Sequence, residues 1–166
     1  MERLRRVDGA YGLDENWIRS VGASVIAQET IGRIDEDQAL RFVEVCGIAG
    51  VRTLIGVAND DLVPGAKLVP AMSVKPTVKD IVAFDRWFVG GNALLYHPDS
   101  SLTWLGTNND FAIFAGRSGL LSRYEPALSA SIDQFRDFAT THLEVLRPTA
   151  LRALDLYERF RPGASF

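Results

Sequence analysis

Residues 93–115, ALLYHPDSSLTWLGTNNDFAIFA, decide the fold class of this chain. Short apolar runs alternate here with turn-forming residues, which is the pattern of strands in a sheet. The runs fall at residues 93–97, 102–105 and 111–115. Between the first two, His97-Pro98-Asp99-Ser100 suits a type I turn, because Pro98 fixes φ at its second position. The flanking strands are therefore predicted to form an antiparallel hairpin.

The strand pattern extends towards the N-terminus. Residues 53–57 and 67–70 are predicted as strands, the second of them short and at a sheet edge. In residues 80–89, DIVAFDRWFV, the side chains that would point to either face of a strand are largely apolar. A strand buried on both faces has this composition, so this segment predicts a central strand.

Helical spacing of apolar residues marks the segments on either side of the predicted sheet. Residues 35–47 begin at Asp35 as N-cap and end at Gly47, with an apolar stripe between them. Residues 129–146 carry a second stripe, with Ser129 or Ser131 available as N-cap.

The C-terminal helix is predicted over residues 148–161. Its stripe consists of Leu151, Leu154, Tyr157 and Phe160. Each large apolar side chain stabilises the protein by about 1.5–3 kcal/mol when it is buried. The stripe is therefore expected to be buried, either against the sheet or against a second copy of the chain in a homodimer.

The first part of the chain is less regular. Residues 1–14 show no sustained apolar period and are predicted to be a mobile or loosely docked arm. Asp14 suits the N-cap of a short helix, whereas residues 23–26 suit an edge strand.

The order of these elements predicts an α+β fold, with a mostly antiparallel sheet of about five or six strands flanked by N-terminal and C-terminal helices. A length of 166 residues predicts a single domain over residues 1–166, because domains typically hold about 100 to 200 residues. The chain is 47% hydrophobic and 23% charged, which is typical of globular domains and not of disordered or collagen-like chains.

The charge balance excludes some partners. The chain carries 18 basic and 21 acidic side chains, and its net charge is −3. The acidic excess lies in residues 1–50, with nine acidic and six basic side chains. Affinity for nucleic acid normally requires a basic excess, so no nucleic-acid partner is expected. No stretch approaches the ~20 apolar residues that span a bilayer, so no membrane partner is expected and the chain is predicted to be cytoplasmic.

Residues that commonly carry out chemistry are few. Cys46 is the single cysteine and closes an apolar stripe, so it is interpreted as a core residue. The two histidines, His97 and His142, are too few for a zinc site without carboxylates. No Gly-x-Ser-x-Gly motif accompanies them. The sequence therefore predicts no catalytic residues, no metal site and no cofactor.

A partner surface is predicted from two acidic turns and one aromatic side chain. Asp60 and Asp61 form one turn, and Asp110 closes the other. Charges of this kind mainly set the association rate, whereas a desolvated aromatic contributes the larger energy. Trp87 or Trp104 is the expected aromatic anchor.

Asp85 is a further candidate because it lies in the otherwise apolar segment 80–89. A buried charge needs a partner, which is expected to be Lys79, Arg86 of a neighbouring molecule or a ligand. The alternative function is therefore a small enzyme or ligand-binding domain. Its pocket would lie between the sheet and the C-terminal helices and would use Asp85, His97 and Asp110 as polar groups.

Two phrases and the elements between them carry a family resemblance. Residues 39–48, ALRFVEVCGI, end a helix in a Gly-apolar pair, and residues 131–146, SIDQFRDFATTHLEVL, open a helix with Ser-apolar-x-x-Phe. With several apolar strands between them, residues 35–146 resemble the SUKH superfamily of immunity-type proteins. The resemblance implies a non-enzymatic protein-binding module, typically a bacterial immunity protein that neutralises a toxin. It implies no catalytic residues, because the family shares none.

Overall fold

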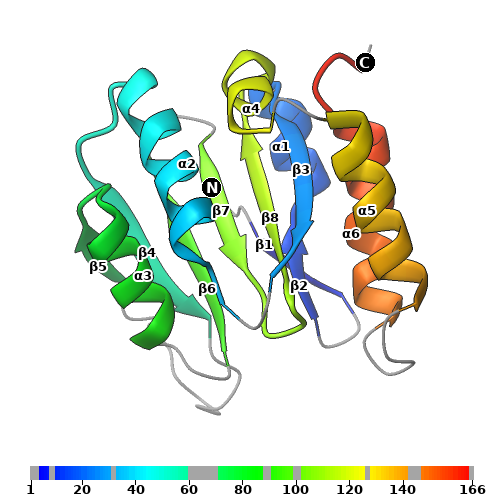
Figure 1. The fold of residues 1–166 in the computed structure, drawn as a ribbon, viewed down its shortest axis with the longest axis horizontal. Helices are drawn as coiled ribbons and strands as arrows, with labels where there is room; N and C mark the ends of the chain where they lie inside the picture. Colours follow the sequence, from blue (N-terminus) through cyan, green and yellow to red (C-terminus); the bar gives the residue numbers. More distant parts are fainter. Residues whose placement is uncertain are drawn as a thin grey trace.

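The computed structural model describes residues 4–7, 10–30, 33–59, 71–87, 91–98, 102–125, 128–141 and 147–164. Within these ranges the chain forms six helices, a two-stranded sheet and a six-stranded sheet (Figure 1). The predicted α+β class is confirmed.

The larger sheet is antiparallel throughout and has the strand order β3-β8-β7-β6-β4-β5. Its strands are β3 (Ser24–Glu29), β4 (Leu54–Asn59), β5 (Ala71–Val74), β6 (Asn92–Tyr96), β7 (Thr103–Gly106) and β8 (Phe111–Gly116). Every residue of β7 and β8 is buried, so the core is centred on these two strands. The predicted hairpin is present, because Tyr96 of β6 pairs with Thr103 of β7.

Helices cover the sheet and one of its edges. In Figure 1, α2 (Glu36–Ile48) and α3 (Val78–Trp87) lie in front of the sheet, and α4 (Ser118–Tyr124) follows the end of β8. Behind the sheet lie α1 (Glu15–Val21) and the hairpin of β1 (Leu4–Val7) and β2 (Ala10–Leu13). The last two helices, α5 (Leu128–Thr141) and α6 (Arg147–Phe160), pack together beside β3.

The largest correction to the sequence prediction concerns residues 80–89. The predicted central strand is wrong, because residues 78–87 form helix α3. The Asp80 N–H donates to Thr77 Oγ1 at 3.2 Å, and the Thr77 hydroxyl donates to Asp80 Oδ2 at 2.8 Å. The first of these bonds satisfies a backbone N–H group in the first turn of a helix, as an N-cap residue does. The buried residues then follow helical spacing: Ile81, Val82, Phe84 and Asp85.

The N-terminal segment contains more regular structure than predicted. Strands β1 and β2 pair within the segment that was predicted to be an arm. Both alternatives for the next segment are correct, because Asp14 caps α1 by accepting from the Trp17 N–H and β3 is an edge strand. The strand predicted at residues 67–70 lies outside the described residues, and the short edge strand observed is β5.

The helices differ from prediction mainly at their ends and faces. Helix α2 is capped by Asp35 as predicted but passes Gly47 and ends at Ile48. Helix α5 begins at Leu128, so Ser129 and Ser131 lie within the helix and do not precede it.

The C-terminal helix is buried within its own chain. It packs against α5 and β3, which favours the intramolecular alternative for its apolar stripe. Leu151 is the exception, because 40% of its surface is exposed whereas Leu154 is only 7% exposed. Ala150 and Ala153 face the interior in its place. No helix in the described part of the chain is both long and apolar enough to cross a bilayer.

Candidate functional site

The predicted aromatic anchors lie in contrasting environments. Trp104 is 1% exposed and contacts Phe114 edge to face in the core, so it is not available to a partner. Trp87, at the end of α3, is 70% exposed. Of the two expected anchors, only Trp87 is on the surface.

Asp85 is buried, but its partners come from its own chain. One carboxylate oxygen accepts from the Ile34 N–H at 3.1 Å, and the other lies 3.6 Å from Nη1 of Arg33. Arg33 Nη1 also donates to the Asp85 carbonyl at 3.0 Å. The ion-pair partner that the structure shows is therefore Arg33, which was not among the expected partners, while Arg86 of the same chain adds only a weaker electrostatic attraction. The carboxylate ties the segment before α2 to helix α3.

The environment of Asp85 changes its proton affinity. Burial raises the pKa of this carboxyl above its ordinary value, although the Ile34 N–H and the Arg33 guanidinium act in the opposite direction. A carboxylate that is fully engaged with its own chain serves structure. We therefore do not place it in a binding site.

Of the other predicted residues, the two that the structure describes, His97 and Asp110, do not converge. Asp60, Asp61 and His142 lie outside the described residues. His97 follows β6 at the end where Tyr96 pairs with Thr103, whereas Asp110 lies beyond the opposite end of the β6–β7 pair. A strand advances ~3.3 Å per residue, so these two residues are separated by at least a strand length. Asp110 is part of a tight turn with φ of 58°, and its carbonyl accepts from the Thr30 N–H at 2.7 Å.

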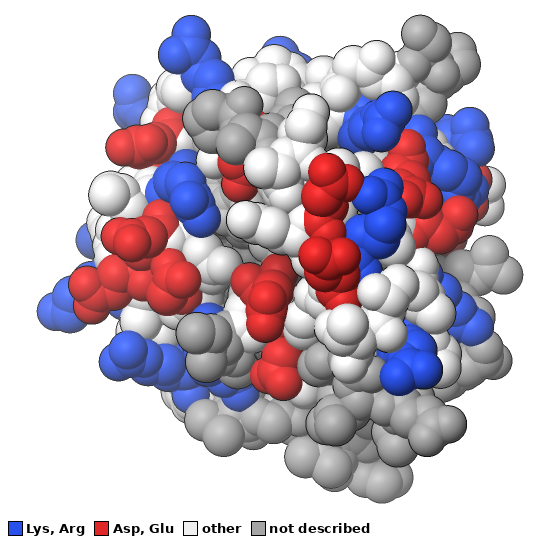
Figure 2. All heavy atoms as spheres, turned by 45° about the vertical axis from the view of Figure 1, so that its right-hand side comes forward, with Lys and Arg blue, Asp and Glu red and all other residues white. Residues whose placement is uncertain are grey.

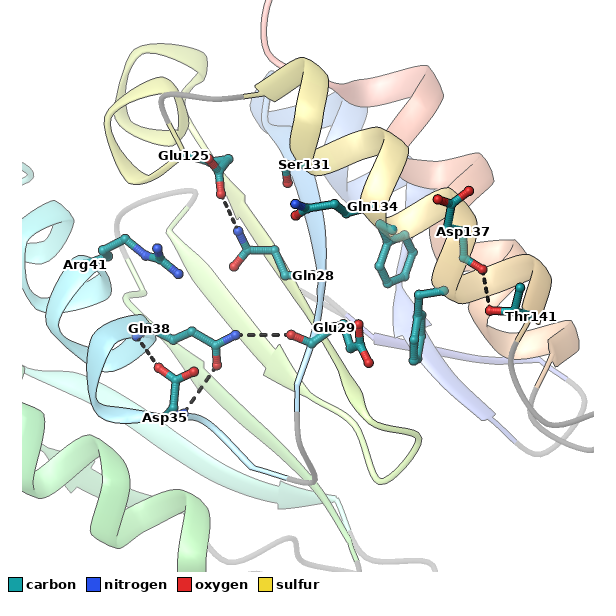
Figure 3. Close-up of a pocket in the computed structure, with 12 residues that line it drawn as sticks. Gln28, Glu29, Asp35, Gln38, Arg41, Glu125, Ser131, Gln134, Asp137 and Thr141 are labelled. Carbon is teal, nitrogen blue, oxygen red and sulfur yellow. Dashed lines mark hydrogen bonds between the residues drawn. The ribbon is translucent and has the colours of Figure 1, made fainter.

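A different group of residues forms a cleft between α2 and α5, over β3 (Figure 3). We name it the α2–α5 cleft, and its volume is about 720 Å³. Its described lining residues are Gln28, Glu29, Asp35, Gln38, Arg41, Glu125, Ser131, Gln134, Phe135, Asp137, Phe138 and Thr141. Ten of these twelve residues are polar.

One wall of the cleft is held by a hydrogen-bond network. Gln28 Nε2 donates to Glu125 Oε2 at 2.7 Å, and the Tyr124 hydroxyl donates to Gln28 Oε1 at 3.0 Å. Burial raises the pKa of the Tyr124 phenol above its usual range, so the phenol stays a donor. The network fixes the orientation of the Gln28 amide and the Glu125 carboxylate, as Figure 3 shows for these two side chains.

The N-terminus of α2 forms a second wall. Asp35 accepts from the Gln38 N–H at 2.6 Å, and the Gln38 side chain reaches back to the Asp35 N–H at 3.3 Å. This capping box stabilises the first turn of the helix. Gln38 Nε2 also donates to the Glu29 carbonyl at 3.2 Å, which joins α2 to the end of β3.

Arg41 supplies the single positive charge among the described lining residues. Its guanidinium carbon lies 5.3 Å from the centroid of the Tyr124 ring, a distance suited to a cation–π contact. Its Nε is buried and has no hydrogen-bond partner in the described structure.

Helix α5 forms the third wall. Phe135 and Phe138 are buried against Phe111 of β8, while the polar side chains between them remain accessible. Ser131 accepts from the Tyr157 hydroxyl of α6 at 3.4 Å, so α6 supports this wall from behind.

The cleft is electronegative. Glu29, Asp35, Glu125 and Asp137 contribute four carboxylates against the single guanidinium. Figure 2 shows acidic side chains gathered across the middle of this face of the molecule. An accumulation of one sign of charge in a cleft raises the local concentration of oppositely charged groups. The cleft is therefore suited to a cationic group.

Comparisons with known proteins do not add to this interpretation: no family model, no curated protein and no solved structure matches the chain. None of the described lining residues of the cleft is histidine or cysteine, and no group of three or more metal-ligating side chains occurs in the described ranges.

Sequence reasoning missed the cleft because its residues come from segments that are distant in the chain. Gln28 and Glu125 are 97 residues apart in sequence. The one available signal was the acidic excess of residues 1–50, to which Glu29 and Asp35 belong.

Proposed function

We propose that this chain is a non-enzymatic protein-binding module whose α2–α5 cleft receives a basic segment of a partner protein. The observation that carries the proposal is the ratio of four carboxylates to one guanidinium in a cleft of about 720 Å³. Glu29, at the end of β3, and Asp137, on α5, are exposed and contribute no described side-chain hydrogen bond or ion pair. They are therefore the carboxylates most available to an incoming lysine or arginine.

The physical basis is electrostatic complementarity. Opposite charge across an interface accelerates association and disfavours partners of the wrong sign. The amide groups of Gln28, Gln38 and Gln134 offer both donors and acceptors, which suits contact with a peptide backbone. The side-chain amides of Gln28 and Gln38 are hydrogen-bonded within the chain, so they are ordered before the partner binds. This order reduces the entropy cost of binding.

The finer proposal is that the partner is a basic toxin domain and that the chain is a bacterial immunity protein acting in the cytoplasm. It is supported by the resemblance of residues 35–146 to SUKH proteins. Occupation of a toxin's basic substrate-binding surface by an acidic module would block that surface directly.

Co-expression of the chain with the products of neighbouring genes tests both levels. We expect one product to be toxic alone, to be neutralised by the chain and to be captured by it. Glu29→Gln combined with Asp137→Asn should weaken capture at low salt by on the order of tenfold, mainly through slower association. Binding kinetics at two salt concentrations measure this effect.

The matched control is Glu36→Gln combined with Glu44→Gln. Both residues are exposed on α2 and lie outside the cleft lining, so the control changes the net charge equally. Equal weakening by the two pairs would contradict the cleft as binding site. A captured partner without toxicity would contradict the immunity proposal alone, and the absence of any captured product would contradict both.

A small cationic ligand is the second candidate for the same cleft, because its volume lies within the range of about 300–1,000 Å³ that ligand pockets occupy. Small-molecule pockets are mostly apolar, whereas this lining is mostly polar, so we rank the protein partner first. Thermal unfolding with spermidine or free arginine separates the two. A concentration-dependent stabilisation that Glu29→Gln with Asp137→Asn abolishes would favour the small ligand.

A further inference from the structure

The two edge strands of the six-stranded sheet, β3 and β5, differ in what packs beside them. Helices α5 and α6 pack beside β3, whereas no strand in the described part of the chain pairs with the outer side of β5. A strand edge presents unpaired N–H and C=O groups, and proteins usually protect it with charged residues or proline within the strand. Strand β5, AMSV, contains neither, although it has only four residues and is followed directly by Lys75 and Pro76.

Helix α3 forms a groove beside this edge. The groove has a volume of about 310 Å³ and its described lining includes Met72, Phe84 and Trp87. Asp80, Ala83 and Trp87 also line it and are spaced by three and four residues, so they lie along one face of the helix. Trp87 is the most exposed of the large apolar side chains that the structure describes, at 70%.

The direction of α3 along β5 places unlike groups at the two ends of the groove. Phe84 lies against Gly56, and Gly56 pairs with Met72, so α3 runs back along β5 towards its start. Lys75 and Asp80 therefore lie near the C-terminal end of β5, and Trp87 lies near its N-terminal end. An antiparallel copy would bring the Trp87 end of one chain against the charged end of the other.

We propose that β5 pairs antiparallel with β5 of a second copy of this chain, so that two sheets join into one and the two α3 helices lie on the same face. This inference goes beyond the proposed function and does not depend on it. Two-fold symmetry brings the Trp87 end of each chain to the Lys75 end of its partner, and an aromatic ring and an ammonium group attract each other in a cation–π contact. The cleft beside β3 is at the opposite end of the sheet and stays open in the dimer.

The symmetry restricts the register. Side chains alternate between faces along a strand, so directly opposed residues in such a dimer must belong to the same face. The two-fold axis therefore lies beside Met72 or beside Ser73, and that residue is directly opposite the same residue of the second copy. Opposed Cα atoms of an antiparallel pair lie ~4.5–5.5 Å apart, within the range that a disulfide spans.

Single cysteines test this geometry in the full-length chain. We expect Met72→Cys or Ser73→Cys to form a disulfide-linked dimer under mild oxidation, whereas Ser129→Cys on the exposed surface of α5 should not. The native Cys46 does not interfere because it is fully buried, and burial raises its pKa to about 12. The unmodified chain under the same oxidation is the control.

Sedimentation measures the same contact without a crosslink. The unmodified chain should dimerise reversibly, and Trp87→Ala should weaken the dimer at least about tenfold without unfolding, since the side chain is exposed. A monomer at every concentration would overturn the proposal. The proposal would also be overturned by a dimer that Trp87→Ala does not weaken and that forms no disulfide through Met72→Cys or Ser73→Cys. Such a dimer would use another surface.

Discussion

At the scale of single residues, position 56 admits only glycine, because the ring of Phe84 occupies the space in which a Cβ would lie. Carbon atoms of the Phe84 ring approach the position of that Cβ to 2.8 Å and closer. Phe84 is only 2% exposed, so a shift of its ring would disturb the side chains packed around it. The glycine therefore permits α3 to lie directly on β4.

We expect Gly56→Ala to destabilise the protein by about 1–3 kcal/mol, the usual cost of adding a methyl group to a packed core. Gly47→Ala is the matched control, because Gly47 lies in α2 and, apart from the neighbouring backbone of its own helix, no atom lies within 4 Å of its ideal Cβ. In a helix, alanine is favoured over glycine by up to about 1 kcal/mol. Urea unfolding of both variants measures the difference, and a similar destabilisation of both would contradict the packing argument.

At the scale of elements, the sequence predicts antiparallel strands and capped helices well because their signals are local. The turn at His97-Pro98 and the cap at Asp35 each lie within a few residues of the structure that they specify. The segment 80–89 failed for a related reason. Its apolar residues fit an alternating pattern as well as a helical one, and the Thr77–Asp80 cap that marks the helix begins three residues before the segment.

The candidate site was less predictable than the fold. The sequence indicates that Asp85 would need a partner if it were buried, but that partner, Arg33, lies 52 residues away and no local pattern connects the two. The α2–α5 cleft depends in the same way on the packing of α5 beside β3. Long-range contacts of this kind are set by tertiary packing and leave no local signal in one sequence.

Helix α6 offers a prediction at the scale of an element, because two leucines on it differ mainly in burial. Leu154 is 7% exposed and Leu151 is 40% exposed. We expect Leu154→Ala to cost about 2–5 kcal/mol, the range for a buried leucine, and Leu151→Ala to cost clearly less. Chemical denaturation measures both. If the two substitutions cost the same, the side of α6 that packs on the protein would have to be reassigned.

At the scale of the whole molecule, a few polar contacts join segments that are far apart in the chain. Arg159 of α6 lies 2.7 Å from Glu15 of α1, a separation of 144 residues, and so links the two ends of the chain. This pair is exposed, and exposed ion pairs contribute about 0.2–1 kcal/mol. The Asp85–Arg33 contact differs because its carboxylate is buried, with 3% of the side chain exposed.

Burial of Asp85 makes the stability of the whole fold depend on pH. The pKa of this carboxyl is raised in the folded protein above its ordinary value of 3.8, first because burial disfavours the charged form. The folded state therefore holds the proton to higher pH than the unfolded state does. Under this linkage the Asp85 contribution to stability decreases as pH rises from about 3.8 through the raised pKa, and it is constant above that pH.

Asp85→Asn removes the titration while keeping an oxygen that can accept from the Ile34 N–H. We therefore expect the free energy of unfolding of the variant minus that of the wild type to increase with pH from about pH 4 and then to level off. Urea unfolding of both proteins at closely spaced pH values measures this difference. If the attraction of Arg33 outweighed burial, the folded pKa would be lowered and the difference would instead decrease as pH rises towards 3.8. Arg33→Gln strengthens the test, because loss of that attraction should raise the folded pKa further and move the plateau to higher pH.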